Sequence, residues 1–339
     1  MIRIQNIYYM LSYAFRVLKE QGYRDIATEE FENVSELCTA ILIKGVSSQI
    51  KKGLYKEYLP KSEPLTLIRG KIDISTSIKE QSMIKKQLVC EYDEFSLNAY
   101  MNRIIRTTMD ILMRSGISKE RKKQLRKLLI YFSEVEPLNR KDINWKLRFN
   151  RNNQTYQMLI AICYLILNGL IQMKADGTMK LMDFLDEQRM CRLYEKFVLE
   201  YYRKEHPEIK TSASQIPWDT DDGYNEMLPV MQSDIMLEKG RNTLIIDTKY
   251  YSHITQQQYD VNTLYSGNLY QIFTYAKNFD AGRGDVSGML LYAKTDEAIL
   301  PDNSYKMGGN SIIVKTLDLD CDFSEVRKQL DGIVEVAFS

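Results

Sequence analysis

Two carboxylates and a lysine lie in neighbouring apolar segments with the spacing of a metal-dependent hydrolytic site. Asp247 and Lys249 are two residues apart in the segment 244–250, so on a strand their side chains would point to the same face. Asp234 lies in the preceding apolar segment, 228–237, and a turn that contains glycine separates the two segments. A hairpin at that turn would bring both carboxylates to one end of a sheet.

A pair of carboxylates in this arrangement is suited to Mg²⁺, which prefers oxygen ligands and keeps several waters. Mn²⁺ could take its place. The main-chain carbonyl of Ile246 is a further candidate ligand. Lys249 could orient a water and stabilise the charge that develops on a phosphodiester during hydrolysis. The Asp-x-Lys triplet alone is weak evidence, because it occurs by chance in many long chains.

Two helical segments could supply further residues to the site. Glu195 lies in a long helical pattern before the first strand and could be a third carboxylate near the metal, with Glu187 as its rival. Glutamates on helix surfaces are mostly solvated, so neither assignment is secure from sequence. Gln271 and Tyr275 are four residues apart, which places them on one helix face. They could support the site or contact DNA.

The spacing of apolar residues predicts the elements that position these side chains. It indicates helices at 6–21, 29–48, 97–114, 119–132, 154–173, 180–204, 269–278 and 323–336. Short segments rich in branched and aromatic residues indicate strands at 55–59, 65–74, 88–95, 227–237, 243–251, 286–293 and 311–316. We therefore expect an α+β N-terminal domain, built of helices plus a small β subdomain, followed by an α/β domain.

Composition places the chain among ordinary globular proteins. Its 339 residues carry 46 Lys and Arg against 45 Asp and Glu, a net charge of +1 that excludes a histone-like polycation. Five widely spaced cysteines without a CxxC exclude a zinc finger or a disulfide framework and fit a reducing cytosol. The N-terminus does not resemble a signal peptide, and the longest uncharged run, 154–173, fits a buried helix. We expect a cytoplasmic protein with no membrane contact.

Two further sequence features concern nucleotides and nucleic acids. The chain has no GxxxxGK[ST] motif, so any nucleotide hydrolysis is expected in another chain. A basic cluster runs from Arg114 to Lys127, is opposed only by Glu120, and continues from Arg140 to Arg151. It could contact DNA phosphates or an acidic partner face. A solvated helix face is the more common meaning of such a cluster.

Several motifs resemble known families. Asp234, Asp247 and Lys249 form a D…DxK pattern that resembles the PD-(D/E)xK nuclease superfamily, and the Gln271–Tyr275 pair resembles one of its branches. Ser233 stands where the superfamily's name has Pro. Motifs along the whole chain resemble the McrC family: Asn6-Ile7-Tyr8-Tyr9-Met10-Leu11-Ser12-Tyr13-Ala14, Gly70-Lys71-Ile72-Asp73, Asp93-Glu94-Phe95, Asn98, Asn102-Arg103-Ile104-Ile105, Leu228-Pro229 through Asp234, Ile246-Asp247-Thr248-Lys249-Tyr250-Tyr251 and Asn268-Leu269-Tyr270-Gln271.

The resemblance implies the nuclease subunit of a modified-cytosine restriction system. It implies an N-terminal partner-docking domain over 1–165, with a β-rich finger at about 53–96, and a PD-(D/E)xK restriction-endonuclease-like domain over 166–339. The implied partner is a McrB-like AAA+ GTPase ring, which would bind GTP and recognise double-stranded DNA with a modified cytosine. The finger would insert into that ring, and a contact between two McrC copies in the assembled complex is left open.

Two other functions remain open on sequence grounds. The chain could be a self-sufficient PD-(D/E)xK repair or defence nuclease that cuts without a partner. It could also be mainly a non-catalytic adaptor that activates a GTPase ring. Cutting without any partner would favour the self-sufficient nuclease. Retained GTPase stimulation after Lys249→Ala would show that the adaptor role is separable from cleavage.

Overall fold

The computed structural model describes residues 2–15, 23, 26, 29–150, 153–173, 179–181, 187–251, 254–258, 261–282, 284–294 and 300–338. Contacts among these residues divide the chain into two compact units. The first combines Met1–Val34 with Phe184–Ser339, and the second is Ser35–Asp183. Within the described ranges, no helix has both the length and the apolar character needed to cross a lipid bilayer.

The first unit is built on a mixed sheet whose six described strands run in the order β14-β15-β13-β10-β9-β6. Strand β10 is internal, antiparallel to β9 and parallel to β13. Such a strand is buried on both faces and reads as a nearly continuous apolar run, as Leu244–Ile246 do. The strands are β6 (Lys210–Ser212), β9 (Ile235–Lys239), β10 (Asn242–Lys249), β13 (Val286–Ala293), β14 (Asn303–Met307) and β15 (Asn310–Leu317).

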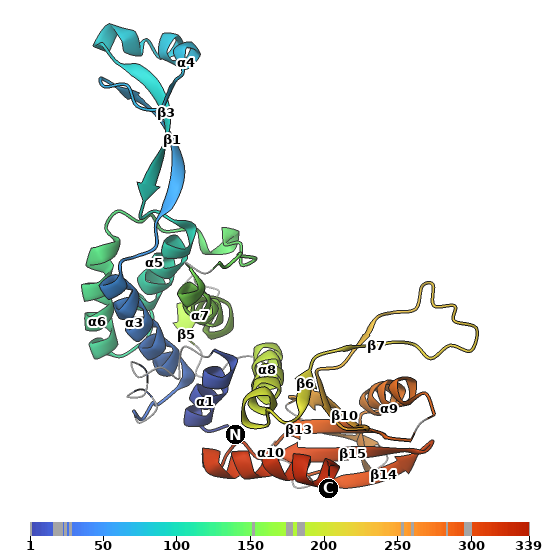
Figure 1. Cartoon of the computed structure of the whole chain (residues 1–339). Helices are drawn as coiled ribbons and strands as arrows, with labels where there is room; N and C mark the ends of the chain where they lie inside the picture. The colour runs from blue at the N-terminus through green and yellow to red at the C-terminus, as the bar shows by residue number, and fades with distance from the viewer. Residues whose placement is uncertain are drawn as a thin grey trace. The chain divides into compact units, whose positions relative to one another are not determined.

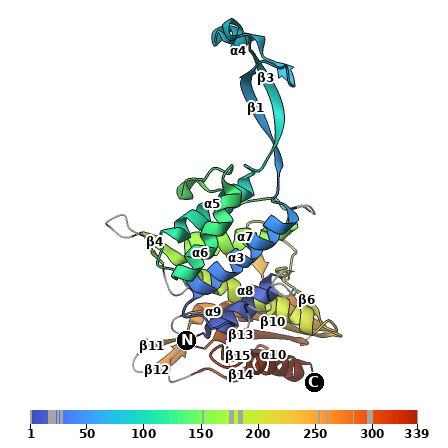
Figure 2. The same cartoon turned by 90° about the vertical axis from the view of Figure 1, so that its left-hand side faces the viewer.

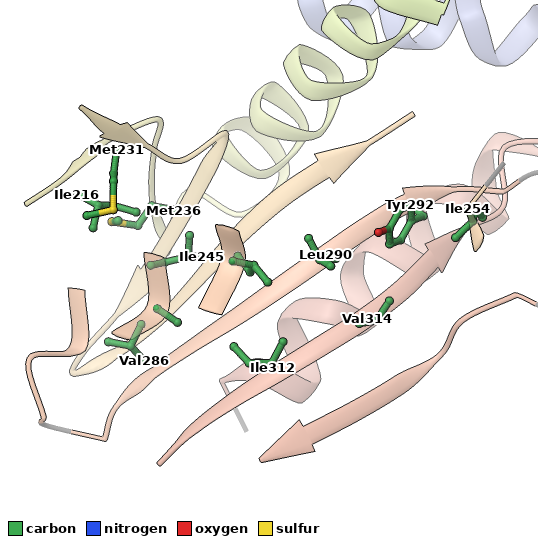
Figure 3. Packing of buried hydrophobic residues seen from close by; sticks show 12 residues of the cluster. Ile216, Met231, Met236, Ile245, Ile254, Val286, Leu290, Tyr292, Ile312 and Val314 are labelled. Atoms are coloured by element: carbon green, nitrogen blue, oxygen red, sulfur yellow. The ribbon is translucent and has the colours of Figure 1, made fainter. Parts of the chain in front are cut away.

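Helices cover both faces of this sheet (Figure 1). Helix α9 connects β10 with the parallel strand β13 and packs over the face that carries Ile245, Leu290 and Val314 (Figure 3). Helices α8 and α10 lie on the other face, where the Tyr202 hydroxyl donates to the Leu330 carbonyl. The helices of this unit are α1 (Ile4–Ala14), α8 (Glu187–Glu205), α9 (Ser266–Asp280) and α10 (Phe323–Ala337), and two small hairpins pair β7 (Gln215–Ile216) with β8 (Met231–Gln232) and β11 (Thr255–Gln258) with β12 (Val261–Leu264).

The N-terminal helix α1 belongs to the unit that contains the sheet. The buried Asn6 amide donates to the carbonyls of Leu319 and Cys321 at 2.8 and 2.9 Å, and the Tyr9 ring stacks on Phe323 at 4.3 Å between centroids. The boundary expected from sequence, at 165/166, differs from this division at both ends. Contacts between residues more than 300 positions apart decide where α1 belongs, and a linear pattern does not contain them.

The second unit is a helical body that carries a long two-stranded arm. Helix α5 is amphipathic and buries Ile104, Ile105 and Leu112, which follow a helical period. The elements of the body are α3 (Val34–Lys52), α5 (Tyr100–Met113), α6 (Lys119–Leu129), η4 (Ile130–Phe132), η5 (Arg140–Asp142), α7 (Gln154–Tyr164), the π-helix η6 (Leu165–Leu170), β4 (Ile171–Met173) and β5 (Met179–Leu181).

The arm, called the finger below (57–96), extends away from the helices of its unit in both views (Figures 1 and 2). Strands β1 (Glu57–Leu65) and β3 (Leu88–Ser96) pair antiparallel along their whole length. The tip contains β2 (Lys71–Ile72), α4 (Ile74–Lys79) and η3 (Ser82–Lys85). Gly70 has φ +70° and lies so close to β3 that a Cβ there would be 2.2 Å from the Glu91 carbonyl oxygen, so this turn requires glycine.

Buried hydrogen bonds fix the base of the finger. The Asn102 side chain is fully buried, and its amide donates to the Tyr55 carbonyl at 2.7 Å and to the Leu97 carbonyl at 2.8 Å. One of these residues precedes β1 and the other follows β3, so a single side chain holds both ends of the hairpin. The Tyr156 hydroxyl donates to the Asn102 Oδ1 at 2.9 Å and accepts from the Tyr55 amide at 2.8 Å.

Some element boundaries expected from sequence are wrong. The strand expected at 65–74 reduces to β2, because the Asp73 side chain accepts a hydrogen bond from the Thr76 amide and starts α4. The single strand expected at 227–237 is broken between β8 and β9. The helix expected from 180 begins as α8 at Glu187, after strand β5. The helix expected at 154–173 changes to a π-helix at Leu165 and ends in β4, and residues 16–21 of the first expected helix lie outside the described residues.

Candidate active site

Asp234 lies in the break between β8 and β9, next to the end of β10. The Ser233 amide donates to the Ser214 carbonyl at 3.0 Å, which holds the chain in this break. The Asp234 Oδ2 accepts two hydrogen bonds of 2.8 Å, one from the Thr248 amide and one from the Thr248 hydroxyl. The register of β9 with β10 ends at the pair Ile235–Ile246, so Asp234 occupies the place where β9 stops pairing.

Asp247 and Lys249 lie on one face of β10, as their spacing predicts. The Asp247 side chain is 2% exposed, and its Oδ2 is 2.6 Å from the Lys249 Nζ. In the parallel register with β13, Lys249 is next to Tyr292. The core cluster of the unit includes Ile245 and Tyr292, residues of the two strands that flank this site (Figure 3). Burial thus leaves Asp247 with the lysine as its charged partner.

Helix α9 brings Gln271 and Tyr275 to the same lysine. The Lys249 Nζ donates to the Gln271 Oε1 at 3.1 Å, and the Gln271 Nε2 donates to the Tyr275 hydroxyl at 3.0 Å. The two residues lie one helical turn apart, so one face of α9 carries the whole chain of hydrogen bonds. The residues expected from sequence at Asp234, Asp247, Lys249, Gln271 and Tyr275 are therefore neighbours in the structure.

The electrostatics of the site favour binding of a cation. Burial raises the pKa of Asp247 to about 6; Lys249 opposes this rise, and the nearby Asp234 carboxylate adds to it. Burial, together with the charges of Asp234 and Asp247, raises the pKa of Glu195 to about 7. Burial acts to lower the pKa of Lys249, but the Asp247 carboxylate raises it overall, so the lysine remains a cation. Added positive charge would relieve the repulsion among the carboxylates.

Glu195, rather than Glu187, is the helix carboxylate that interacts electrostatically with Asp234 and Asp247. It lies on α8 and is partly buried, and its pKa responds to both Asp234 and Asp247. Glu187 is the first residue of α8 and interacts with Tyr250. Within the described ranges, however, no three or more His, Cys, Asp or Glu side chains are arranged as a metal site. Glu195 is therefore near the two aspartates without completing a three-carboxylate cluster with them.

The buried carboxylate of Asp247 has the chemistry of a metal ligand. Its Oδ2 is buried and lies 2.6 Å from the Lys249 Nζ, a charged partner that offsets its loss of water. Burying a carboxylate costs free energy unless opposite charges replace the lost water. A hard cation would satisfy this oxygen, and two carboxylates plus waters are a donor set that Mg²⁺ accepts. The residues of the site therefore fit the metal expected from sequence.

The main-chain carbonyl at Ile246 lies within the paired part of the sheet. Ile246 pairs with Ile235 of β9 and with Met289 of β13. Thr248 has no partner on β9, and its amide points to Asp234. Because the N–H and C=O of one residue in a strand point to the same side, the Thr248 carbonyl faces the open side of β10. Thr248 is thus a better-placed main-chain donor than Ile246.

Sequence reasoning missed two supporting contacts. Thr248 fixes Asp234 with both its amide and its hydroxyl, and the buried Asn268 amide donates to the Tyr292 hydroxyl at 3.0 Å beside the site. Thr248 lies between the two recognised residues of the Asp-Thr-Lys triplet. Its hydroxyl group, a hydrogen-bond donor next to two charged residues, was the feature of the sequence that could have indicated this role. The Asn268–Tyr292 contact joins α9 to β13 and has no sequence signal of its own.

Comparisons with known proteins match most of the length of this chain. A sequence model of the family described as "McrBC 5-methylcytosine restriction system component" matches residues 4–293. The type IV methyl-directed restriction enzyme EcoKMcrBC of Escherichia coli K12 is 29% identical over 346 residues, which cover 98% of this chain and 97% of that protein.

A solved structure has a similar fold. It is a half-complex from a tetradecameric assembly of Thermococcus gammatolerans McrB AAA+ hexamers with bound McrC. The matched chain is 16% identical, with a TM-score of 0.54, and the match covers 96% of this chain and 75% of that one. The family match covers most of this chain, and it agrees with the motifs from Asn6 to Gln271. The chain therefore belongs to the McrBC 5-methylcytosine restriction system component family.

Proposed function

We propose that this chain is the DNA endonuclease subunit of a GTP-dependent, methylcytosine-specific restriction complex, with a PD-(D/E)xK active site in the unit that contains the sheet. The observation that carries the proposal is the convergence of Asp234, Asp247 and Lys249 at the open end of β10. Membership in the restriction-system family and the similarity to the E. coli restriction enzyme support it.

In this proposal Asp234 and Asp247 hold Mg²⁺, with the Thr248 carbonyl as the main-chain donor and Glu195 as a further carboxylate whose pKa responds to both aspartates. Bound Mg²⁺ would polarise the phosphodiester and lower the pKa of an attacking water. The support is the donor set itself, two neighbouring carboxylates of which one, Asp247, is buried. Mn²⁺ would fit the same oxygen ligands.

Lys249 supplies a fixed positive charge beside the scissile phosphate. The ion pair with Asp247 and the hydrogen bond to Gln271 hold its ammonium from two sides. Tyr275 accepts from Gln271 and so fixes the orientation of that amide. A preorganised cation of this kind stabilises the charge that develops in the transition state, and it can orient the water. Gln271 and Tyr275 act through Lys249 as positioning residues.

The second unit docks on the partner, which we propose is a McrB-like AAA+ GTPase ring that binds GTP. Support comes from the finger, whose tip exposes apolar side chains that monomeric surfaces rarely group together. These exposed residues are Leu67, Ile68, Ile74, Ile78, Met83 and Ile84. The solved relative with a similar fold comes from an assembly of McrB hexamers with bound McrC. Insertion of this tip into the ring would bury the apolar surface.

Plasmid cleavage tests the endonuclease function. The chain is mixed with the AAA+ GTPase encoded beside its gene, in Mg²⁺ and GTP, with cytosine-methylated plasmid as substrate and unmethylated plasmid as the control. We expect the methylated plasmid alone to be cut, and EDTA to prevent cutting. Failure to cut under all these conditions would reject the endonuclease proposal.

The docking function has its own test. Changing Leu67→Gln together with Ile84→Gln removes two apolar side chains that are 83% and 78% exposed, so the fold should not change. We expect the variant to stimulate the partner's GTPase less than wild type does. Mg²⁺ binding at the other unit, measured as the increase in melting temperature on adding Mg²⁺, should persist. The matched control is Ile130→Gln, an apolar residue of the same unit that is 71% exposed outside the finger. Equal stimulation by the finger variant and wild type would contradict docking through the tip.

A further inference from the structure

Helix α6 presents a surface of cations that the proposed site and the finger do not use. The α6 basic surface consists of Arg114, which directly follows α5, and of Lys119, Lys122, Lys123, Arg126 and Lys127 on α6; all are exposed except Lys122, which is partly exposed. The helix is anchored by the fully buried Leu125 and by Arg121, whose guanidinium lies 3.6 Å from Glu36 of α3. The anchoring residues therefore turn inwards, and the remaining cations face solvent.

The cations of the α6 basic surface have no acidic partner among the described residues. Other exposed lysines do: Lys61 pairs with Glu94, Lys294 with Asp318 and Lys328 with Glu325, all within 2.7 Å. The chain as a whole is almost neutral, so this unbalanced surface is local. Several cations are also spaced four residues apart, which destabilises a helix by repulsion. Neutralisation by a polyanion would remove that repulsion.

We propose that the α6 basic surface binds the phosphate backbone of duplex DNA without reading its sequence. The nine residues from Lys119 to Lys127 span about 12 Å of helix. Duplex DNA carries one charge per about 1.7 Å of its axis, so several phosphates lie within reach of these side chains. The inference rests on the proposed function only in taking DNA as the substrate of the complex.

The composition of the surface favours DNA over an acidic protein. Lysines make up most of it, and lysine is depleted in the buried cores of protein–protein interfaces. Such interfaces also need apolar anchors, but Leu125 is buried and the exposed Ile130 and Tyr131 lie only at the C-terminal end of the surface. Flexible, exposed ammonium groups are suited instead to mobile contacts with phosphates, which release counterions.

The test compares DNA binding by the full chain and by the variant Lys119→Gln/Lys123→Gln/Lys127→Gln. Anisotropy of a labelled duplex without modified cytosine is measured in EDTA over a series of KCl concentrations. We expect the variant's affinity to fall at least about tenfold at low salt, and the slope of log affinity against log salt to shrink by about 2–3. The matched control, Lys239→Gln/Lys306→Gln/Lys328→Gln, loses the same charge from exposed lysines of the other unit and should change little.

Three results would overturn the proposal. They are absence of DNA binding by the wild-type chain at low salt, equal affinity and slope in the α6 variant and wild type, and equal losses in the α6 variant and the control. Loss of association with the GTPase partner, with DNA binding unchanged, would assign the surface to an acidic protein face instead. Because binding is measured in EDTA, a chain that binds DNA through α6 but never cuts would reject the endonuclease proposal alone.

Discussion

Asp247 is the residue of the proposed site whose carboxylate would gain most from a bound cation. Its carboxylate is buried, and burial raises its pKa to about 6 although the Lys249 ammonium opposes this rise. The neighbouring Glu195 has a pKa of about 7, chiefly through burial. Protons and Mg²⁺ compete for such carboxylates, because only the ionised form is a good ligand. Metal affinity should therefore depend on pH over a range set by these two groups.

We expect the apparent Mg²⁺ affinity to rise from pH 5 to about pH 8 and to level off above it. Below pH 6 both raised carboxyls are protonated in the metal-free chain, and above pH 7 both are ionised. The measurement is the Mg²⁺-dependent increase in melting temperature at each pH, with EDTA as reference. Removing the helix carboxyl with Glu195→Gln should flatten the upper part of the profile. An affinity that is constant over this range would contradict a metal site at Asp247.

Thr248 offers a milder change to the same site. The variant Thr248→Val keeps the amide that donates to Asp234 but loses the hydroxyl that donates to the same oxygen. Losing one hydrogen bond of about 1 kcal/mol should weaken Mg²⁺ binding about fivefold. The control Thr243→Val changes another buried threonine of β10, at the opposite end of the strand. Equal effects of the two variants on metal binding would show that the Thr248 hydroxyl has no special role.

At the scale of elements, the site exists because β9 stops pairing where β10 continues. The alternation of a strand was enough to predict from sequence that Asp247 and Lys249 share a face. The position of Asp234 could not be predicted in detail, because the expected strand divides at Ser233 into β8, which pairs with β7, and β9, which pairs with β6 and β10. The helical spacing of Gln271 and Tyr275 was visible, but their link to Lys249 depends on how α9 packs over β10.

The contacts at the base of the finger likewise could not be predicted from sequence, and they lead to a testable prediction. Asn102 was recognisable as part of a motif, but its two contacts, to Tyr55 and Leu97, connect segments that a local pattern does not relate. The variant Asn102→Asp replaces the donating amide with a carboxylate beside two carbonyls. It should lower the free energy of unfolding by about 1–3 kcal/mol, because donors are lost and a charge is buried.

Urea unfolding and GTPase stimulation together check this prediction. Because Asn102 fixes both ends of the finger, we also expect weaker stimulation of the partner. The control Asn144→Asp changes an exposed asparagine of the same unit and should leave both properties unchanged. An Asn102→Asp variant that matches wild type in stability and stimulation would mean that the finger is held without this side chain.

At the scale of the whole molecule, the division into two units follows contacts rather than chain order. The motif from Asn6 to Ala14 was recognised from sequence and was assigned to the first domain expected there. In the structure α1 joins the sheet unit through Asn6, Tyr9 and Tyr13, whose hydroxyl donates to Glu205 at 2.7 Å. The segment with the proposed nuclease site is therefore completed by residues from the opposite end of the chain.

This arrangement predicts a regional effect of Asn6→Asp. The variant removes the two bonds to Leu319 and Cys321 and should lower local stability by about 1–3 kcal/mol. Amide hydrogen exchange should become faster in α10 and β15 and stay unchanged in α3 and α5, since stability is lost within one cooperative unit. Faster exchange in α3 and α5 alone would instead place α1 with the second unit.

The most direct test of the account changes Lys249 in the assembled complex. The variant Lys249→Ala, with the GTPase partner, Mg²⁺ and GTP, is compared with wild type for cleavage of methylated plasmid and for GTP hydrolysis. The account predicts cleavage slower by about 10²–10³-fold, through loss of transition-state stabilisation, and unchanged GTPase stimulation. The control Lys239→Ala, at the far end of β9, should cut as wild type does. Cleavage at the wild-type rate by Lys249→Ala would contradict the assignment of the active site.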